Sequence, residues 1–152
     1  MENQNVISSR NAANAGISKV LYTGKLHVTG GREGNASSSD GRLNITLSTP
    51  GGPGAGTNPE QLFAAGWSAC FIGAMKHNAS GLKIALPANL AVDTEVDLGT
   101  GDGGFYLQAR LNVSLPGLTP DEARAVVSAA HETCPYSKAT RGNINVDINV
   151  TV

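Results

Sequence analysis

Charged residues are scarce in this chain of 152 residues: 15% are Asp, Glu, Lys or Arg, against about 25% in an average soluble domain. The formal net charge of −1 argues against a nucleic-acid-binding surface, because such domains carry a basic excess. No apolar run approaches the ~18 residues of a membrane span. The polar start also lacks the apolar core of a signal peptide. We therefore expect a cytoplasmic protein that binds neither nucleic acid nor membrane.

The rest of the composition is that of one globular domain. Hydrophobic residues make up 40% of the chain, and 19 glycines predict many tight turns. We expect residues 1–18 to form a flexible polar extension and residues 19–152 to form a single domain. Because so little charge leaves little polar surface, part of that domain should be covered by a partner or a second copy.

Alternating apolar and polar residues predict five strands, each with one buried face, as in antiparallel sheets. The stretches are 20–28, 43–47, 90–98, 105–115 and 144–152, with a hairpin turn at 99–104. Two further stretches predict helices. Residues 59–80 follow the N-cap Asn58 and are apolar on nearly every side, which is typical of a buried helix; residues 119–134 form a second helix that Pro135 ends. The fold class is α+β.

The chain has only two cysteines, Cys70 and Cys134, one on each predicted helix. In a reducing compartment such a pair is more often catalytic, redox-sensing or metal-binding than a permanent disulfide, although free cysteines are often plain buried side chains. His77 and His131 could complete a zinc-binding set. However, Cys70 and His77 lie ~10 Å apart along one helix, so that one ion could hardly bind both. We predict no metal site.

A redox role for Cys70 requires a cation from elsewhere in the chain. Apolar burial raises the pKa of a thiol, and the N-terminus of the helix is too distant to lower it. Arg32, in the glycine-rich turn 30–34, is the best placed cation, and Glu60 could hold it in an apolar site. Each residue has a plain alternative: Arg32 as an exposed turn residue and Glu60 as a partner of the helix dipole.

Three motifs point further. They are Gly-Gly-Arg-Glu-Gly at 30–34, Asn-Pro-Glu-Gln-Leu-Phe-Ala-Ala-Gly-Trp-Ser-Ala-Cys-Phe at 58–71 and Cys-Pro-Tyr-Ser-Lys-Ala-Thr-Arg-Gly-Asn at 134–143. In this order they resemble the organic hydroperoxide resistance proteins, the Ohr branch of the Ohr/OsmC family. The resemblance covers roughly residues 20–152. The polar start and Trp67, where the family often has tyrosine, depart from the family pattern.

The resemblance implies a thiol peroxidase that reduces organic hydroperoxides to alcohols. Cys70 would be the peroxidatic cysteine and Cys134 the resolving one, with Arg32 stabilising the thiolate and Glu60 positioning Arg32. The reaction would pass through a sulfenic acid and a disulfide. A lipoyl-type dithiol, either dihydrolipoamide or a lipoylated protein, would then reduce that disulfide, and no bound cofactor is implied.

Apolar side chains near Cys70 suit an alkyl or fatty-acyl hydroperoxide better than hydrogen peroxide. We expect Phe63, Trp67 and Phe71 to line the substrate pocket. A non-catalytic thiol sensor or binding protein with the same cysteine pair is the alternative, and a small zinc-bound module is a third.

A straight helix over 59–80 separates Glu60 and Cys70 by ~15 Å along its axis and by about 80° around it. A single Arg32 could hardly reach both residues within one chain. We therefore expect an intertwined homodimer with OsmC-like antiparallel sheets wrapped around paired central helices. Glu60 is the residue that we expect from the partner chain.

Overall fold

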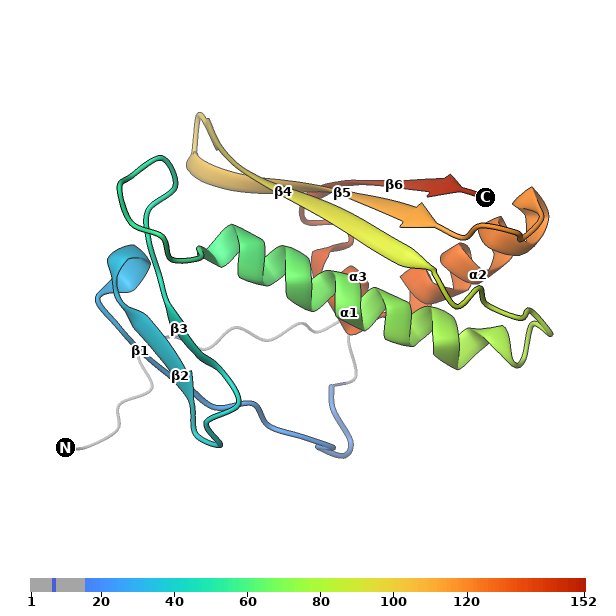
Figure 1. Ribbon diagram of the computed structural model, residues 1–152, viewed down its shortest axis with the longest axis horizontal. Helices are drawn as coiled ribbons and strands as arrows, with labels where there is room; N and C mark the ends of the chain where they lie inside the picture. Colours follow the sequence, from blue (N-terminus) through green and yellow to red (C-terminus); the bar gives the residue numbers. More distant parts are fainter. Residues whose placement is uncertain (1–6, 8–15) are drawn as a thin grey trace.

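The computed structural model describes residue 7 and residues 16–152 (Figure 1). Most of the predicted extension over residues 1–18 lies outside these residues. The helices are η1 (Gly31–Glu33), α1 (Pro59–Ala79), α2 (Pro120–Thr133) and α3 (Pro135–Thr140). The strands are β1 (Leu26–Thr29), β2 (Asn35–Ser38), β3 (Asn44–Thr46), β4 (Ala91–Gly101), β5 (Gly104–Ser114) and β6 (Asn145–Thr151). The α+β class is confirmed.

Helix α1 begins where its sequence predicts. The side chain of Asn58 accepts a hydrogen bond of 2.9 Å from the backbone N–H of Gln61, and Pro59 occupies the first turn, where no intrahelical donor is needed. The helix runs without interruption to Ala79. One of its faces is buried, whereas a stripe on the other side is exposed, consisting of Leu62, Ala65, Ala69 and Gly73. Within a single chain, therefore, α1 is buried on one side only.

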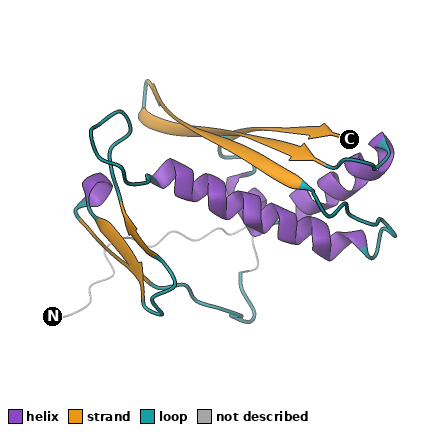
Figure 2. Cartoon of the chain, viewed as in Figure 1, coloured by secondary structure: helices purple, strands orange, loops and turns teal. Residues whose placement is uncertain are grey.

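The larger sheet has the order β4-β5-β6 and lies across α1 (Figure 2). Strands β4 and β5 form the predicted antiparallel hairpin, in which Val96 is opposite Ala109. Strand β6 pairs with β5 in parallel, so the prediction of a purely antiparallel sheet is wrong. A parallel pair needs a crossover connection, and α2 and α3 form it.

The core lies between this sheet and the helices. Alternate residues of β5 point inward and are buried, as are the inner side chains of α1 and α2. The largest fully buried side chains include Trp67, Phe71, Met75 and Leu111. The alternation therefore predicts the inner face correctly from Leu107 to Leu115, whereas Phe105 at the start of the strand is exposed.

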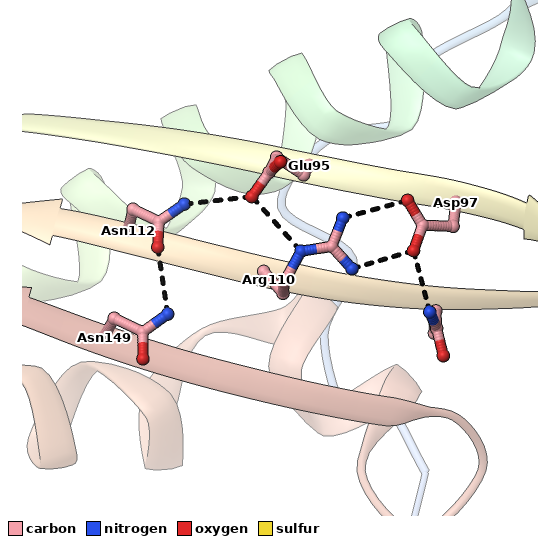
Figure 3. A network of polar contacts seen from close by, with 6 residues as sticks. Glu95, Asp97, Arg110, Asn112 and Asn149 are labelled. Atoms are coloured by element: carbon pink, nitrogen blue, oxygen red, sulfur yellow. Dashed lines mark hydrogen bonds and ion pairs between the residues drawn. The ribbon is translucent and has the colours of Figure 1, made fainter.

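The outer face of the same sheet is polar (Figure 3). Arg110 donates two hydrogen bonds to Asp97, of 2.7 and 2.9 Å, and one of 3.2 Å to Glu95. The guanidinium holds the pKa of both carboxyl groups below their usual values. Asn112 continues the network from Glu95 to Asn149 on β6. Water-exposed ion pairs of this kind contribute little stability, so the network mainly keeps this face solvated.

The smaller sheet, β1-β2-β3, is antiparallel throughout. It differs from prediction in two ways. Residues 20–25 are not a strand, and β2 lies outside the five predicted strands, because its Asn-Ala-Ser-Ser sequence is too polar to signal one. No described residue of β1–β3 belongs to the main core cluster, and Figure 1 shows this sheet standing beside the N-terminal end of α1. Leu26 and Val28 on β1 are therefore about half exposed in their own chain, although Ala36 on β2 is buried.

Helix α2 begins with a capping box between Thr119 and Glu122, as its sequence predicts. It ends at Thr133, close to the predicted end. Pro135 is the first residue of the short helix α3, which was not predicted. Cys134 is the hinge between the two helices, being the C-cap of α2 and the N-cap of α3. A side-chain N–H of Arg141 donates to the carbonyl of His131 and so closes the junction from the far end of α3.

Across the residues that the structure describes, no helix combines the length and apolar character needed to span a membrane.

The stability of the domain should depend on the inner face of β5. Leu111 has no exposed surface, so Leu111→Ala should lower the free energy of unfolding by about 2–5 kcal/mol through lost burial and the cavity left behind. Chemical denaturation measures this. Leu82→Ala, at a leucine that is 42% exposed, is the matched control and should cost clearly less. Equal losses for the two variants would contradict this account of the core.

Candidate active site

The two cysteines meet beneath the sheet. Cys70 lies in the middle of α1 and Cys134 at the α2–α3 junction, and their sulfur atoms are 3.1 Å apart. Both are free thiols; Cys134 is fully buried and Cys70 partly exposed. A disulfide has a sulfur–sulfur bond of about 2.05 Å, so closing it needs a movement of only about 1 Å. The arrangement can therefore switch between dithiol and disulfide without unfolding.

The surroundings of Cys70 hold its thiol in the protonated form. Burial raises its pKa, and the contact with Cys134 raises it further, because the two sulfurs hold a proton between them. The backbone N–H of Tyr136, in the first turn of α3, donates to Cys70 and acts in the opposite direction. Arg32 is not among the described groups that shift this pKa. An attacking thiolate at Cys70 thus needs a further positive charge.

The ion pair expected between Arg32 and Glu60 is present. Two parallel hydrogen bonds of 2.6 and 2.9 Å join the guanidinium to the carboxylate, which lies in the first turn of α1. This contact keeps the pKa of Glu60 below its usual value, so the carboxylate stays charged and the pair intact at neutral pH.

Arg32 and Glu60 pair within one chain, so a partner that brings Glu60 to a site brings Arg32 with it, and the partner origin of Glu60 stays a prediction. The short turn of η1 carries Arg32 to the start of α1, ten residues before Cys70. Within one chain the cation therefore lies at the start of the central helix and the thiol at its middle, as the helix geometry required.

The predicted pocket residues fare unevenly. Trp67 and Phe71 have no exposed surface and belong to the core, so they do not line an open pocket in this chain; Phe63 is partly exposed and packs edge-on against Trp67. An open cleft of about 460 Å³ lies instead beside Glu60, between α1 and β4. Its walls include Ala64, Thr94, Val96 and Leu98. The apolar pattern of α1 could not distinguish side chains that fill a core from those that face a cleft.

Sequence reasoning missed the part played by the residues after Cys134. Tyr136 brings a backbone donor to Cys70, and the hydroxyl of the fully buried Ser137 accepts a hydrogen bond of 3.3 Å from the indole N–H of Trp67. The signal was present, because both residues stand in the Cys-Pro-Tyr-Ser motif. That motif was assigned to its cysteine alone.

The zinc alternative finds no support in the described residues, among which no three His, Cys, Asp or Glu side chains gather as metal ligands. His131 lies near the α2–α3 junction, and its ring nitrogen Nδ1 is buried without a partner. Burial and the nearby Arg141 lower the pKa of His131, so the ring is neutral at pH 7.

Comparison with protein families agrees with the motifs. The family described as "OsmC-like protein" matches residues 50–149. The organic hydroperoxide resistance protein of Xanthomonas axonopodis pv. citri is 51% identical over 136 residues, which cover 87% of this chain and 96% of that protein. The organic hydroperoxide resistance protein OhrB of Bacillus subtilis is 41% identical, with 86% of this chain and 98% of that protein covered.

Solved structures give the same result. A crystal structure of an organic hydroperoxide resistance protein from Legionella pneumophila superimposes with a TM-score of 0.82 at 46% identity, covering 88% of this chain and all of that one. The crystal structure of OhrB from Bacillus subtilis has a TM-score of 0.81 at 42% identity and covers 87% of this chain and 100% of that one. The resemblance inferred from the three motifs is confirmed.

The sulfur contact predicts the outcome of mild oxidation. One equivalent of diamide should convert the reduced protein fully to a Cys70–Cys134 disulfide, with no change in far-ultraviolet circular dichroism, because the sulfurs already touch. Peptide mapping by mass spectrometry identifies the bond. The variant Cys134→Ser should give none of it. Oxidation that required denaturant, or that produced mainly disulfides between chains, would contradict the geometry.

Proposed function

This chain belongs to the OsmC-like family, and from that premise we propose that it is a thiol peroxidase that reduces organic hydroperoxides. The observation that carries the proposal is the 3.1 Å separation of the Cys70 and Cys134 sulfurs. Cys70 is a partly exposed thiol with a second thiol already in contact. Such a pair is suited to two-electron oxidation of the first thiol and rapid formation of a disulfide with the second.

The reaction proceeds in two steps. The Cys70 thiolate attacks the terminal oxygen of the hydroperoxide; the O–O bond breaks, a Cys70 sulfenic acid forms, and the alkoxide takes up a proton and leaves as the alcohol. The Cys134 thiol then attacks the Cys70 sulfur. The S–O bond breaks, the S–S bond forms, and hydroxide leaves with the thiol proton as water. An external dithiol, which we propose to be of the lipoyl type, returns both cysteines to thiols.

The attack on the hydroperoxide needs a cation beside Cys70. Within one chain, however, Arg32 is held by Glu60 in the first turn of α1, ten residues before Cys70. We propose that the Arg32–Glu60 pair of a second copy supplies the cation. The bidentate contact leaves Arg32 preorganised and 40% exposed on its side chain, so one edge of the guanidinium can face a partner's thiolate. Each site of such a dimer would combine the cysteines of one chain with the ion pair of the other.

Two uncovered surfaces support a second copy. All four residues of β1 are exposed, including Leu26 and Val28, and the sheet that contains them lies outside the core of its own chain. The stripe of Leu62, Ala65 and Ala69 on α1 is exposed as well. Small residues on a helix let another helix approach closely, so a two-fold dimer could pair the α1 helices and give the β1–β3 sheet a surface to cover.

Turnover with substrate tests the function. The protein should consume cumene hydroperoxide with dihydrolipoamide as reductant, and faster than hydrogen peroxide, because each methylene that an apolar site buries contributes ~0.8 kcal/mol. Cys70→Ser should abolish consumption. Cys134→Ser should form a sulfenic acid but no intrachain disulfide, and its steady-state turnover with dithiol should fall steeply.

Two outcomes would count against the proposal. Wild-type turnover in Cys134→Ser would show that Cys134 is not the resolving cysteine. Equal rate constants for cumene hydroperoxide and hydrogen peroxide would show that the site does not prefer apolar substrates. If the disulfide formed with peroxide but no dithiol supported turnover, a thiol sensor would be the better description.

Mixed dimers test the shared site. Chains carrying Cys70→Ser and chains carrying Glu60→Ala should each be inactive alone. In the mixed dimer, Cys70 of one chain meets the intact Arg32–Glu60 pair of the other, so that one site of two is complete. A statistical mixture should therefore recover about one quarter of the wild-type activity. An inactive mixture in which mass spectrometry finds mixed dimers would place the whole site in one chain.

A further inference from the structure

A buried hydrogen bond joins the two helices that carry the cysteines. The indole N–H of Trp67 on α1 donates to the hydroxyl of Ser137 on α3 over 3.3 Å, and neither residue has any exposed surface. We propose that this bond positions the resolving cysteine, holding Cys134 at attacking distance from Cys70. The proposal rests on the proposed function, because it assigns the resolution step of that reaction.

The residues of the Trp67–Ser137 hydrogen bond lie near the two cysteines in sequence. Trp67 precedes Cys70 by three residues, and Ser137 follows Cys134 by three residues. On α1 three residues make nearly one turn, so Trp67 lies on about the same face as Cys70 and ~5 Å along the axis. Ser137 lies in the first turn of α3, directly after the cap residue Cys134. The sulfur contact and the hydrogen bond are thus neighbouring contacts between the same two segments.

Further contacts tie the first turn of α3 to α1 along the same line. Phe63 packs edge-on against Tyr136, with ring centroids 6.0 Å apart, and also against Trp67 at 5.5 Å. A side-chain carbon at Gly66 would come within 2.9 Å of the Tyr136 hydroxyl, so the absence of a side chain there is what lets Tyr136 approach. Edge-on aromatic contacts tolerate a range of ring separations, whereas the hydrogen bond holds its donor and acceptor within a narrow distance.

The buried indole N–H of Trp67 has no other acceptor nearby than the Ser137 hydroxyl among the hydrogen bonds of the described residues. The indole carries a single donor, and a buried donor left without an acceptor has lost its hydrogen bond to water and gained none in return. Any movement of α3 that takes Cys134 away from Cys70 also stretches this bond in a site that water does not reach. The hydrogen bond therefore destabilises conformations in which the two thiols are apart, in addition to the effect of side-chain packing.

Loss of the bond should slow the resolution step. In that step the Cys134 sulfur displaces hydroxide from the Cys70 sulfenic acid, which needs the two sulfurs in line and in contact. A looser α3 lowers the fraction of time that Cys134 spends in reach. The sulfenic acid then survives longer and meets a second hydroperoxide, which oxidises it to the sulfinic acid.

The test compares three single variants. Ser137→Ala removes the acceptor with little change in shape, whereas Trp67→Phe removes the donor together with part of the buried ring system. Thr140→Val is the matched control, because Thr140 is also buried in α3 but its hydroxyl donates only to the carbonyls of Tyr136 and Ser137 within α3. Thermal unfolding and circular dichroism establish that each variant is folded.

The first readout needs no peroxide, so it stands whether or not the proposed activity does. Equilibration with a glutathione redox buffer gives the effective concentration of Cys134 at Cys70. Ser137→Ala and Trp67→Phe should each lower it about tenfold, and Thr140→Val should leave it near the wild-type value. The double variant, with donor and acceptor both absent, should be no worse than either single variant, because no stranded donor remains.

The second readout follows single turnover with cumene hydroperoxide. Ser137→Ala should lengthen the lifetime of the sulfenic acid, trapped with dimedone, and raise the yield of sulfinic acid. An effective concentration at the wild-type value in Ser137→Ala would overturn the proposal. So would an equal drop in Thr140→Val, since the effect would then reflect the stability of α3 alone, or an additive loss in the double variant.

Discussion

Packing of one face of α1 against the β4–β5–β6 sheet and α2 is the constraint on which the rest of the structure depends. It places Trp67, Phe71 and Met75 in the core and leaves Cys70 at the boundary between core and solvent. The crossover from β5 to β6 must then pass beneath the same sheet, which brings the α2–α3 junction to α1. A fully buried Cys134 in contact with a partly exposed Cys70 is the consequence.

Much of this was predictable from the sequence, and the failures have specific causes. The capped start and long apolar run of α1, the capping box of α2 and the alternation in β4 and β5 are local signals, and local signals were enough for them. The polar strand β2 exists because β1 and β3 flank it, and the six-residue α3 begins at Pro135 without a side-chain cap. Neither β2 nor α3 can be recognised from residue propensities or from the spacing of apolar residues.

The site divides in the same way. The pairing of Arg32 with Glu60 and of Cys70 with Cys134 followed from the motifs and from elementary chemistry. The arrangement of the two pairs did not, because it depends on where η1 directs the Arg32 side chain. Trp67 shows a further limit: a large apolar residue one turn from a reactive thiol is the natural choice for a substrate wall, yet its buried N–H commits it to Ser137.

The parallel pairing of β5 with β6 also has a consequence for the growing polypeptide. Cys70 leaves the ribosome 64 residues before Cys134, and the crossover that delivers Cys134 is fixed only when residues 145–151 add the last strand. Contacts between such distant parts of a chain form late in folding. A nascent chain therefore carries Cys70 without its protecting neighbour until synthesis is nearly complete. The thiol that is partly exposed in the finished molecule is most accessible while that molecule is being made.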